Sequence, residues 1–468
     1  MNTVKEAIKL YQSGEYKQAE KLYRKLHITS PENAEFLRQI GLCLYNQQKF
    51  DRATKFLEKG LKYAKNKKTI INNLSGIYFN LLQYRDVINL YDKHKKFFTE
   101  IGSIEALGLS YHNLRQYSDA EKCYLKILNI NSKYYKAYAY LADIEVLNYN
   151  FDTAIELYQK SLNYNKNYPE ANKSLGMLHL LKGDFLLGWE GYEWREGEPD
   201  KGIIPNIPLF KEKFPTEGKS ICVYSEQGFG DTIQFSRYLP LLKLKFNKVI
   251  FLCQEKVFRL FSKDKSIDLL HIKEIFEYKK HKIDYQIPLL SLPKLFKTDL
   301  NNIPPALSLN IDKQERVSNT KKIGVCWAGN PENPNDINRS MQFDDILPLI
   351  KENKNIEFYN LQIGYDKAEI KSKTSDLKNW FDCTDSFNDF ADTANFIQNL
   401  DCVISVDTSV AHLAGTLGIK TFLLIPYIPE WRWMLDRKDS PWYPSMTILR
   451  QDSSNKWDSS IEKINGLL

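Results

Sequence analysis

Two short phrases in the second half of the chain contain the residue types that group-transfer chemistry needs. The first, Glu226-Gln-Gly-Phe-Gly-Asp231, follows the apolar run 220–225 and precedes an amphipathic stretch. Gly228 and Gly230 let the backbone approach a ligand closely, and a following helix offers free N–H groups. Asp231 has two interpretations at such a position. It is a helix cap, or a carboxylate that accepts a proton from a nucleophile.

The second phrase, Asp407-Thr-Ser-Val-Ala-His412, begins where an apolar run at 402–406 ends. It puts Asp407, Thr408 and Ser409 at a predicted strand-to-helix junction. Free amides and two hydroxyls there suit a diphosphate, helped by the positive end of the helix. His412 falls in the first turn of that helix, where we expect a neutral imidazole. A hydrogen-bonded packing histidine is an equal alternative.

Further candidates follow the predicted strand 322–327. Trp327-Ala-Gly-Asn-Pro331 is a loop, and Arg339 lies a few residues beyond it. A loop arginine can pair bidentately with phosphate. Near the end of the chain, Trp431 and Trp433 would stack on a base or sugar, or pack between lobes, and packing is favoured. The chain contains no Asp-x-Asp, so developing negative charge is expected to meet helix amides and cationic side chains instead of a metal.

The elements that position these phrases alternate between strand and helix. Seven runs predict strands, at 220–225, 248–253, 284–289, 322–327, 356–361, 402–406 and 421–425. Such alternation predicts two parallel, right-handed α/β units, the first after a Pro-containing linker at 203–209 and the second after a polar linker at 312–321. Ligands bind at the carboxyl ends of the strands in such sheets, so we expect both phrases to line an interdomain cleft.

The first 200 residues show a different pattern. Aromatic residues recur every 33 or 34 positions, at Tyr16, Phe50, Tyr84, Tyr117, Phe151 and Phe185. A row of small residues keeps nearly the same step, at Gly41, Gly76, Gly108, Ala142 and Gly176. This period is that of the tetratricopeptide repeat, a stacking helix–turn–helix unit. We expect the small residues to allow close helix approach, and the aromatics to fill the groove between successive hairpins.

The last repeat, with Trp189, Tyr192 and Trp194, is more aromatic than the others. It is predicted to join the repeats to the first α/β unit, which we call the amino lobe; the second α/β unit is the carboxyl lobe. The repeats as a whole have two equally weighted uses. They form a concave groove for an extended polypeptide, or a rigid spacer or dimerisation surface.

Composition narrows the class of protein. The 468 residues are 43% hydrophobic and 26% charged, with net charge +7 and no concentrated basic stripe, which disfavours nucleic-acid binding. No apolar run approaches the roughly 20 residues of a membrane span, and the first residues lack a signal-peptide core. The seven cysteines are scattered and read as reduced, mostly buried thiols. A cytoplasmic location is expected.

Taken together, the phrases resemble bacterial tetratricopeptide-repeat proteins with a carboxyl-terminal heptosyltransferase-like glycosyltransferase domain. The resemblance covers essentially the whole chain and rests on six ordered motifs, at 226–238, 327–331, 338–340, 389–394, 406–415 and 431–444. It implies an all-α repeat solenoid followed by two Rossmann-like lobes in a GT-B arrangement. The expected domains are 1–200 for the repeats, 201–318 for an acceptor-side lobe and 319–468 for a nucleotide-sugar lobe.

The resemblance also implies roles for residues. Asp231 matches the general base, and Asp407, Thr408 and Ser409 match the stretch that holds the donor diphosphate and sugar. Arg339 matches a basic residue that neutralises the leaving diphosphate, and His412 matches the histidine of the second phrase. The other residues expected on the donor side are Trp327, Gly329, Asn330 and Gln362.

These expectations define a metal-independent, inverting glycosyltransferase. It needs no cofactor, because the nucleotide-diphosphate sugar is its substrate, and its acceptor is a protein or peptide bound by the repeats. A homodimer is compatible with the repeats. The alternatives are a transferase that acts on a surface-glycan precursor, and a repeat scaffold whose transferase domain is inactive.

Overall fold

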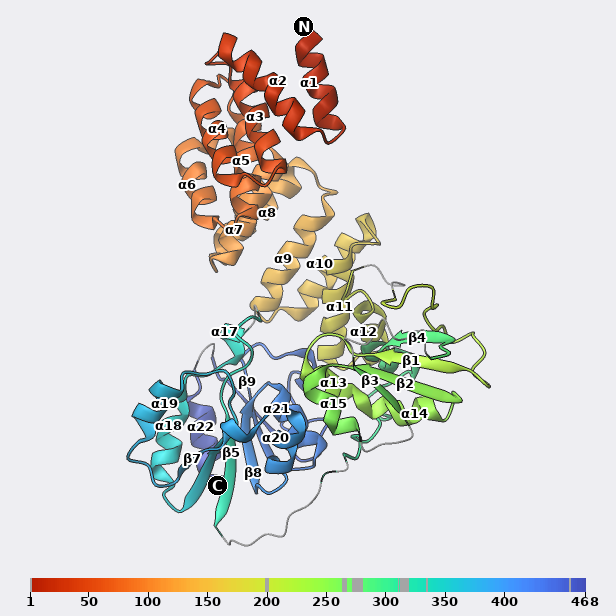
Figure 1. Ribbon diagram of the computed structural model, residues 1–468. Coiled ribbons are helices and arrows are strands. Elements are labelled where there is room, and N and C mark those ends of the chain that lie inside the picture. The colour runs from red at the N-terminus through yellow and green to blue at the C-terminus, as the bar shows by residue number, and fades with distance from the viewer. Residues whose placement is uncertain are drawn as a thin grey trace. The chain divides into compact units, whose positions relative to one another are not determined.

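The computed structural model describes residues 2–197, 202–262, 267–271, 281–309, 311, 320–333, 336–453 and 456–468. The chain divides into two compact units, residues 1–171 and 172–468 (Figure 1). The predicted boundaries near residues 200 and 318 and most of the polar linker 312–321 lie outside the described residues. The three-domain division therefore stays a prediction.

The first unit is a stack of antiparallel helix pairs, as the 34-residue period predicts (Figure 1). Each repeat contributes a first and a second helix, and a short 3₁₀ turn, η1 (Lys95–Phe97), follows the third pair. The helices are α1 (Asn2–Gln12), α2 (Tyr16–Thr29), α3 (Ala34–Asn46), α4 (Phe50–Tyr63), α5 (Lys68–Asn80), α6 (Tyr84–His94), α7 (Ile101–Asn113), α8 (Tyr117–Ile130), α9 (Tyr135–Leu147) and α10 (Phe151–Tyr164).

A left-handed residue terminates the first helix of every pair, two positions before the periodic aromatic. Glycine fills this position only at Gly14 and Gly183, with φ of 83° and 90°. Elsewhere it is Gln48, Leu82, Arg115 or Tyr149, with φ between 59° and 65°. The next N–H donates back to a carbonyl five residues earlier, as in Lys49 to Leu44 at 2.9 Å. This is the Schellman geometry that satisfies the last carbonyls of a helix.

The periodic aromatics begin the second helices, and here the structure corrects the prediction. The aromatic partner of Tyr16 is Tyr11, at 5.4 Å between ring centroids, and that of Phe50 is Tyr45, at 5.5 Å. Phe151 contacts Tyr149 of the turn, and Phe185 contacts Trp189 and Trp442. The rings of Tyr16, Phe50, Tyr84 and Tyr117 pack across the turn of their own hairpin against the end of the preceding helix. The sharp left-handed turn brings the two helix ends together, so these contacts lie within a repeat and not in the groove between successive hairpins.

The row of small residues does allow close helix approach, at most of its positions. A Cβ at Gly108 would lie 2.6 Å from a ring carbon of Tyr124, and one at Gly41 would lie 2.6 Å from Leu57 Cγ. Gly76 is the exception, since a Cβ there meets nothing within 4 Å. The third repeat, where the period drifts to 33 residues, is thus packed more loosely at this position.

The second unit begins with one more helix pair, α11 (Pro169–Lys182, of which residues 172–182 belong to this unit) and α12 (Phe185–Tyr192). Trp189 of α12 donates its indole N–H to the Thr298 carbonyl at 2.9 Å, and its ring packs edge-on against Trp431 at 5.4 Å. Trp189 thus contacts both lobes within the second unit, and its role as a joint to the repeats of the first unit stays a prediction.

The amino lobe holds a four-stranded parallel sheet in the order β3-β2-β1-β4. Three of its strands were predicted, and β3 was not. The strands are β1 (Ser220–Tyr224), β2 (Lys248–Cys253), β3 (Asp268–His271) and β4 (Tyr285–Pro288), with helices α13 (Phe229–Phe235), α14 (Leu239–Lys243), α15 (Glu255–Phe261) and α16 (Leu292–Leu295) and the 3₁₀ turns η2 (Ser236–Tyr238) and η4 (Leu289–Ser291).

The carboxyl lobe holds a six-stranded parallel sheet in the order β10-β9-β8-β5-β6-β7. The strands β7 and β10 were not predicted. The strands are β5 (Lys321–Cys326), β6 (Ile356–Asn360), β7 (Trp380–Asp382), β8 (Cys402–Val406), β9 (Thr421–Ile425) and β10 (Met446–Arg450). The helices are α17 (Asp336–Arg339), α18 (Phe343–Glu352), α19 (Lys367–Thr374), α20 (Phe390–Ile397), α21 (Ser409–Thr416) and α22 (Asp458–Asn465), and the 3₁₀ turns are η5 (Thr384–Ser386) and η6 (Trp431–Trp433).

Two parallel sheets with interspersed helices confirm the α/β prediction, while the GT-B arrangement stays a prediction. All seven cysteines are free, and six are buried, as expected for structural thiols; Cys383 is partly exposed. Within the described residues, none of the helices has the length and apolarity to cross a membrane.

Candidate functional site

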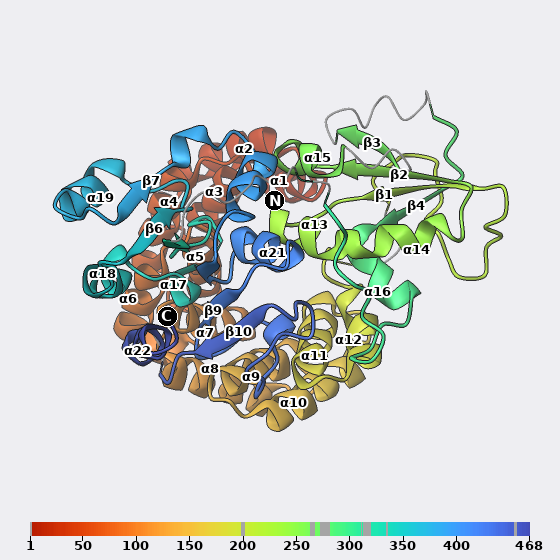
Figure 2. The ribbon, with the colours of Figure 1, turned by 90° about the horizontal axis from the view of Figure 1, so that it is seen from below.

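The two candidate phrases meet between the lobes, where α13 packs against α21 (Figure 2). Gly230 is the point of closest approach. A Cβ on Gly230 would lie 2.7 Å from Cδ2 of His412 and 3.4 Å from the Ser409 Cα. Only glycine fits here without displacing the imidazole. The structure thus unites residues that are about 180 positions apart in one site at the carboxyl ends of β1 and β8.

Asp231 is the third residue of α13, and both of its carboxylate oxygens have partners. Oδ2 accepts a hydrogen bond from the Gly228 N–H at 2.8 Å, which is the helix-capping role. Oδ1 accepts one from Nη2 of Arg432, in an ion pair that joins the two lobes. The cap interpretation is therefore confirmed. The ion pair is an additional contact that no periodicity in the sequence reveals.

Arg432 was not predicted as a site residue, although it lies between the two tryptophans of interest. Its Nε donates to Gln234 Oε1 at 2.6 Å, and its Nη1 pairs with Glu430. The guanidinium carbon lies 4.2 Å from the centroid of the Trp431 ring. Burial opposes the cation, but the carboxylates of Glu430 and Asp231 outweigh it and raise the pKa of Arg432. The signal in the sequence was a cation flanked by aromatics and preceded by an acid.

The phrase Asp407–His412 directly follows strand β8, as predicted. Burial raises the pKa of Asp407, although Trp433, Arg432 and Arg339 act in the opposite direction. Thr408, the N-cap of α21, makes no capping bond with its side chain, and its hydroxyl lies 3.0 Å from that of Ser405. The first-turn amides of α21 therefore lack a cap from Thr408, which leaves the N–H pattern that suits an anion.

His412 is buried, and it links the phrase to the end of the chain. Its Nδ1 lies 3.1 Å from the Tyr443 hydroxyl, its Nε2 lies 3.9 Å from Asp407 Oδ1, and its ring stacks on Trp433. Burial, followed by the charges of nearby arginines, holds the pKa of His412 well below its ordinary value. The predicted neutral imidazole agrees with this direction. The dominant cause is burial, where the sequence interpretation invoked the helix end.

Arg339 reaches the same site from α17. Its Nη1 donates to the Asp407 carbonyl at 3.3 Å, and its Nε pairs with Asp336 at 3.1 Å. Gly329 makes room for it, because a Cβ there would lie 2.5 Å from Arg339 Nη2. Ser340 fixes the loop by accepting the Gly329 N–H at 2.8 Å. The structure thus brings Gly329 and Arg339 next to the phrase Asp407–His412.

The remaining predicted residues are engaged elsewhere. The Trp327 side chain is buried in the core of the carboxyl lobe and packs edge-on against Phe343 at 4.9 Å. Gln362 is also buried, and its Oε1 accepts the Ala328 N–H at 2.8 Å, which holds the loop after β5. Asn330 is exposed and accepts the Glu332 N–H in a turn. Their side chains therefore support the loop.

A second contact joins the lobes where α15 and the first residue of α13 meet the start of α20. Arg259 pairs with Asp389 and Asp392, each at 3.1 Å, and Phe229 meets Phe390 at 5.2 Å between ring centroids. Exposed ion pairs of this kind contribute little energy, so the buried contacts around His412 and Arg432 dominate the lobe interface. In the described part of the chain, no group of three or more His, Cys, Asp or Glu residues has a geometry that could hold a metal ion.

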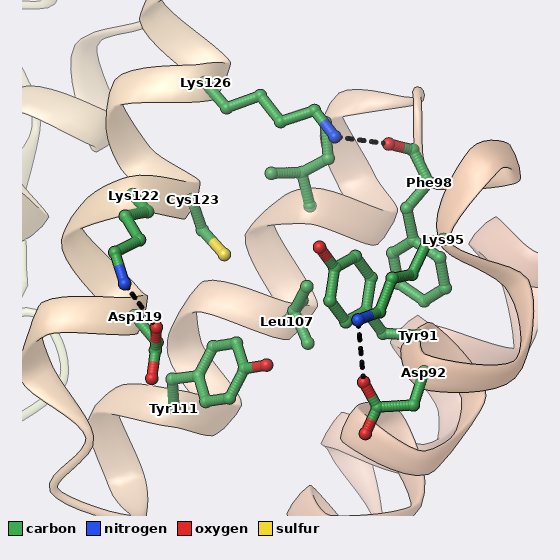
Figure 3. Close-up of a pocket in the computed structure, with 11 residues that line it drawn as sticks. Tyr91, Asp92, Lys95, Phe98, Leu107, Tyr111, Asp119, Lys122, Cys123 and Lys126 are labelled. Carbon is green, nitrogen blue, oxygen red and sulfur yellow. Dashed lines mark hydrogen bonds and ion pairs between the residues drawn. The ribbon is translucent and has the colours of Figure 1, made fainter.

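The repeat unit contains a cavity of its own, about 300 Å³ in volume, between α6, α7 and α8 (Figure 3). Tyr91, Leu107 and Cys123 contribute to its lining. Its rim lysines already have partners: Lys122 pairs with an aspartate at 2.8 Å, and Lys126 donates to a backbone carbonyl at 2.9 Å. The charged groups of the cavity therefore favour no one class of ligand.

Comparison with known proteins supports the assignment of tetratricopeptide repeats to the amino-terminal region. A family model described as "Tetratricopeptide repeat" matches residues 10–70. Among curated proteins, the chain is similar to Protein FlbA of Caulobacter vibrioides, with 22% identity over 334 residues, covering 63% of this chain and 55% of that protein. The chain thus spans just over half the length of this relative.

Several solved repeat structures are also similar in part. A tetratricopeptide repeat protein from Parabacteroides merdae is 19% identical with a TM-score of 0.38, over 42% of this chain and 80% of that one. PilF of Pseudomonas aeruginosa is 16% identical with a TM-score of 0.34, over 42% and 85%. YrrB, a TPR protein with an unusual peptide-binding site, is 14% identical with a TM-score of 0.33, over 36% and 89%.

The family match and the observed helix pairs agree on the fold of the amino-terminal region. Its amino-terminal region contains tetratricopeptide repeats, which suggest protein interaction, and an α/β region with two parallel sheets follows.

Proposed function

We propose that the protein is a metal-independent glycosyltransferase with a GT-B arrangement of its two lobes. It moves a sugar from a nucleotide-diphosphate donor to an acceptor hydroxyl. The observation that carries this proposal is the close approach of Gly230 to His412, which unites Asp231 with the Asp407–His412 phrase. Ligands of parallel α/β sheets bind at the carboxyl ends of the strands, and both phrases lie there.

In the proposed reaction, Asp231 takes the proton from the acceptor hydroxyl. The acceptor oxygen forms a bond to the anomeric carbon while the bond from that carbon to the diphosphate oxygen breaks, with inversion. The first-turn amides of α21 and the guanidinium of Arg339 would meet the charge of the leaving diphosphate. His412, neutral and hydrogen-bonded to Tyr443, would contribute a donor or acceptor without adding charge.

We propose a protein or peptide acceptor, because tetratricopeptide repeats commonly hold extended chains. Removal of residues 1–170 tests this proposal, since the boundary between the compact units lies at 171 and 172. Transfer to a protein acceptor should be lost while hydrolysis of the donor continues. Unchanged transfer would remove the repeats from acceptor recognition and favour a surface-glycan precursor.

The central experiment is hydrolysis of ADP-, GDP-, UDP- and CDP-linked sugars by the full chain, compared with Asp231→Asn. One donor should be turned over, and Asp231→Asn should lower its rate by about 100-fold or more, the scale of general-base catalysis. A variant that matches the wild-type rate would contradict the assignment of Asp231.

A second candidate function is a repeat scaffold whose α/β region has lost activity. The observation that favours it is the engagement of both Asp231 oxygens, one by Gly228 and one by Arg432, as in a structural carboxylate. The outcome expected for a scaffold is no turnover of any donor, together with unchanged binding of a protein partner by Asp231→Asn.

A further inference from the structure

The buried guanidinium of Arg432 forms ion pairs with two carboxylates at the lobe interface. Nη2 of Arg432 contacts Asp231 of the amino lobe, while Nη1 contacts Glu430, two residues away in its own loop. The side chain of Arg432 is only 8% exposed, so little water competes for its charge. The two carboxylates therefore compete for one cation.

The guanidinium is held in place by neutral contacts. Its Nε donates to the buried Gln234, and its central carbon lies 4.2 Å from the centroid of the Trp431 ring. A cation fixed in this way cannot follow either carboxylate far. What can change is the charge of the carboxylates that it serves.

Several other charged or titratable groups act on Glu430 and Arg432. From the element after β8, Asp407 raises the pKa of Glu430, as does Asp231 from α13, while Arg432 lowers it. From α12, Tyr192 acts on Arg432, and the neutral His412 lies on α21. Burial is the largest effect and raises the pKa of Glu430 to about 7, so its charge changes near neutral pH.

We propose that Glu430 is a positioning residue that sets, through Arg432, the positive charge that faces Asp231 during the proposed proton transfer. When Glu430 is ionised, it shares the guanidinium with Asp231 and offsets part of its charge. When Glu430 is protonated, the full charge of the guanidinium faces Asp231 and opposes the transfer of the acceptor proton. This inference rests on the proposed function of Asp231 as the base. It adds that donor turnover rises as the pH passes through about 7.

Glu430→Gln tests the proposal, because an amide reproduces the size of the protonated acid and cannot ionise. With the donor found in the panel, kcat at pH 8 should fall by about tenfold, a part of the general-base contribution. The inflection near pH 7 should disappear, and KM for the donor should change by less than about twofold. Glu430→Asp, which keeps the carboxylate, should retain the inflection.

Glu193→Gln is the matched control. Glu193 also pairs with a buried arginine, Arg195, at 3.2 Å, in a cluster that includes Ser291 and does not contact Asp231. Its pH profile should match that of the wild type. A wild-type profile in Glu430→Gln, or loss of the inflection in Glu193→Gln, would overturn the proposal.

A spectroscopic measurement separates this inference from the proposed function. Infrared difference spectra of the full chain between pH 5 and 9 should show one carboxyl that titrates near 7 and is absent in Glu430→Gln. If the wild type hydrolyses no donor, the proposed function fails, and this titration still decides whether Glu430 changes charge. A difference spectrum without that carboxyl would reject the role of Glu430 even in an active enzyme.

Discussion

Gly230 of the amino lobe and His412 of the carboxyl lobe lie so close that a Cβ on residue 230 would stand 2.7 Å from the imidazole Cδ2. This contact joins the two predicted phrases in one site. Because the imidazole is buried and bonded to Tyr443, it cannot move aside at low cost.

Gly230→Ala should therefore separate the lobes or displace His412. We expect a loss of about 1–3 kcal/mol in the free energy of unfolding, as for overpacked cores. Urea unfolding followed by tryptophan fluorescence measures it, and donor turnover should fall as well. Gly466→Ala is the control, because a Cβ there meets only carbonyls at 3.8 Å. Equal stability of the two variants would contradict the close contact.

The low pKa of His412 predicts how stability responds to acid. The folded protein resists protonation of this imidazole, whereas the unfolded chain takes up the proton below about pH 6.5. The contribution of neutral His412 to the free energy of unfolding is thus present above pH 6.5 and is lost as the pH falls. Relative to His412→Gln, the wild type should lose up to about 2 kcal/mol between pH 6.5 and 5. Parallel pH curves for the two proteins in chemical denaturation would disprove it.

The raised pKa of Glu430 predicts the opposite dependence of folding stability on pH. Its pKa rises from 4.5 in the unfolded chain to about 7 when folded, so the folded state binds the additional proton between these values. Wild-type stability should therefore fall relative to Glu430→Gln as the pH rises from 4.5 to 7. The full effect is on the order of 3 kcal/mol, reduced because a quarter of the side chain stays exposed. Denaturation midpoints at four pH values test the sign.

Trp189 should be essential to the second unit, because it contacts both lobes from α12. We expect Trp189→Ala to cost about 3–5 kcal/mol through the cavity that it leaves. Leu187→Ala on the same helix is the control, since Leu187 is 61% exposed, and it should change stability by less than about 0.5 kcal/mol. Thermal unfolding monitored by circular dichroism compares the two, and similar melting curves would exclude this role.

Leu82→Gly should stabilise the repeat unit. Leu82 is 71% exposed and adopts a φ of 59°, a left-handed conformation that costs a side-chain-bearing residue about 1 kcal/mol or more. Gly14 and Gly183 occupy the equivalent position in the first and last repeats. The unfolding midpoint of the variant should rise. A lower midpoint would mean that the flexibility of glycine in the unfolded chain outweighs the relief of strain.

Most of the strands could be predicted from the sequence, because burial on both faces leaves a continuous apolar run. All seven predicted strands are present. The three that were missed, β3, β7 and β10, lie at sheet edges, where one side of the strand lacks a neighbour. The β7 segment, Trp380–Asp382, is short and largely exposed, so its residues show no strand pattern.

The sequence by itself determined the local features of this protein: the repeat period, the parallel α/β units, and the positions of Asp231 and Asp407 at the ends of strands. These features follow from patterns of residue type along the chain, which can be recognised without knowing the contacts between distant segments. Only the tertiary structure decided that Arg432 pairs with Asp231, 201 positions away, and that Trp327 is a core residue. The physical reason is that such pairings depend on how two sheets far apart in the sequence pack against each other in the second unit. The residue pattern of a single chain segment does not predict how the two sheets pack against each other.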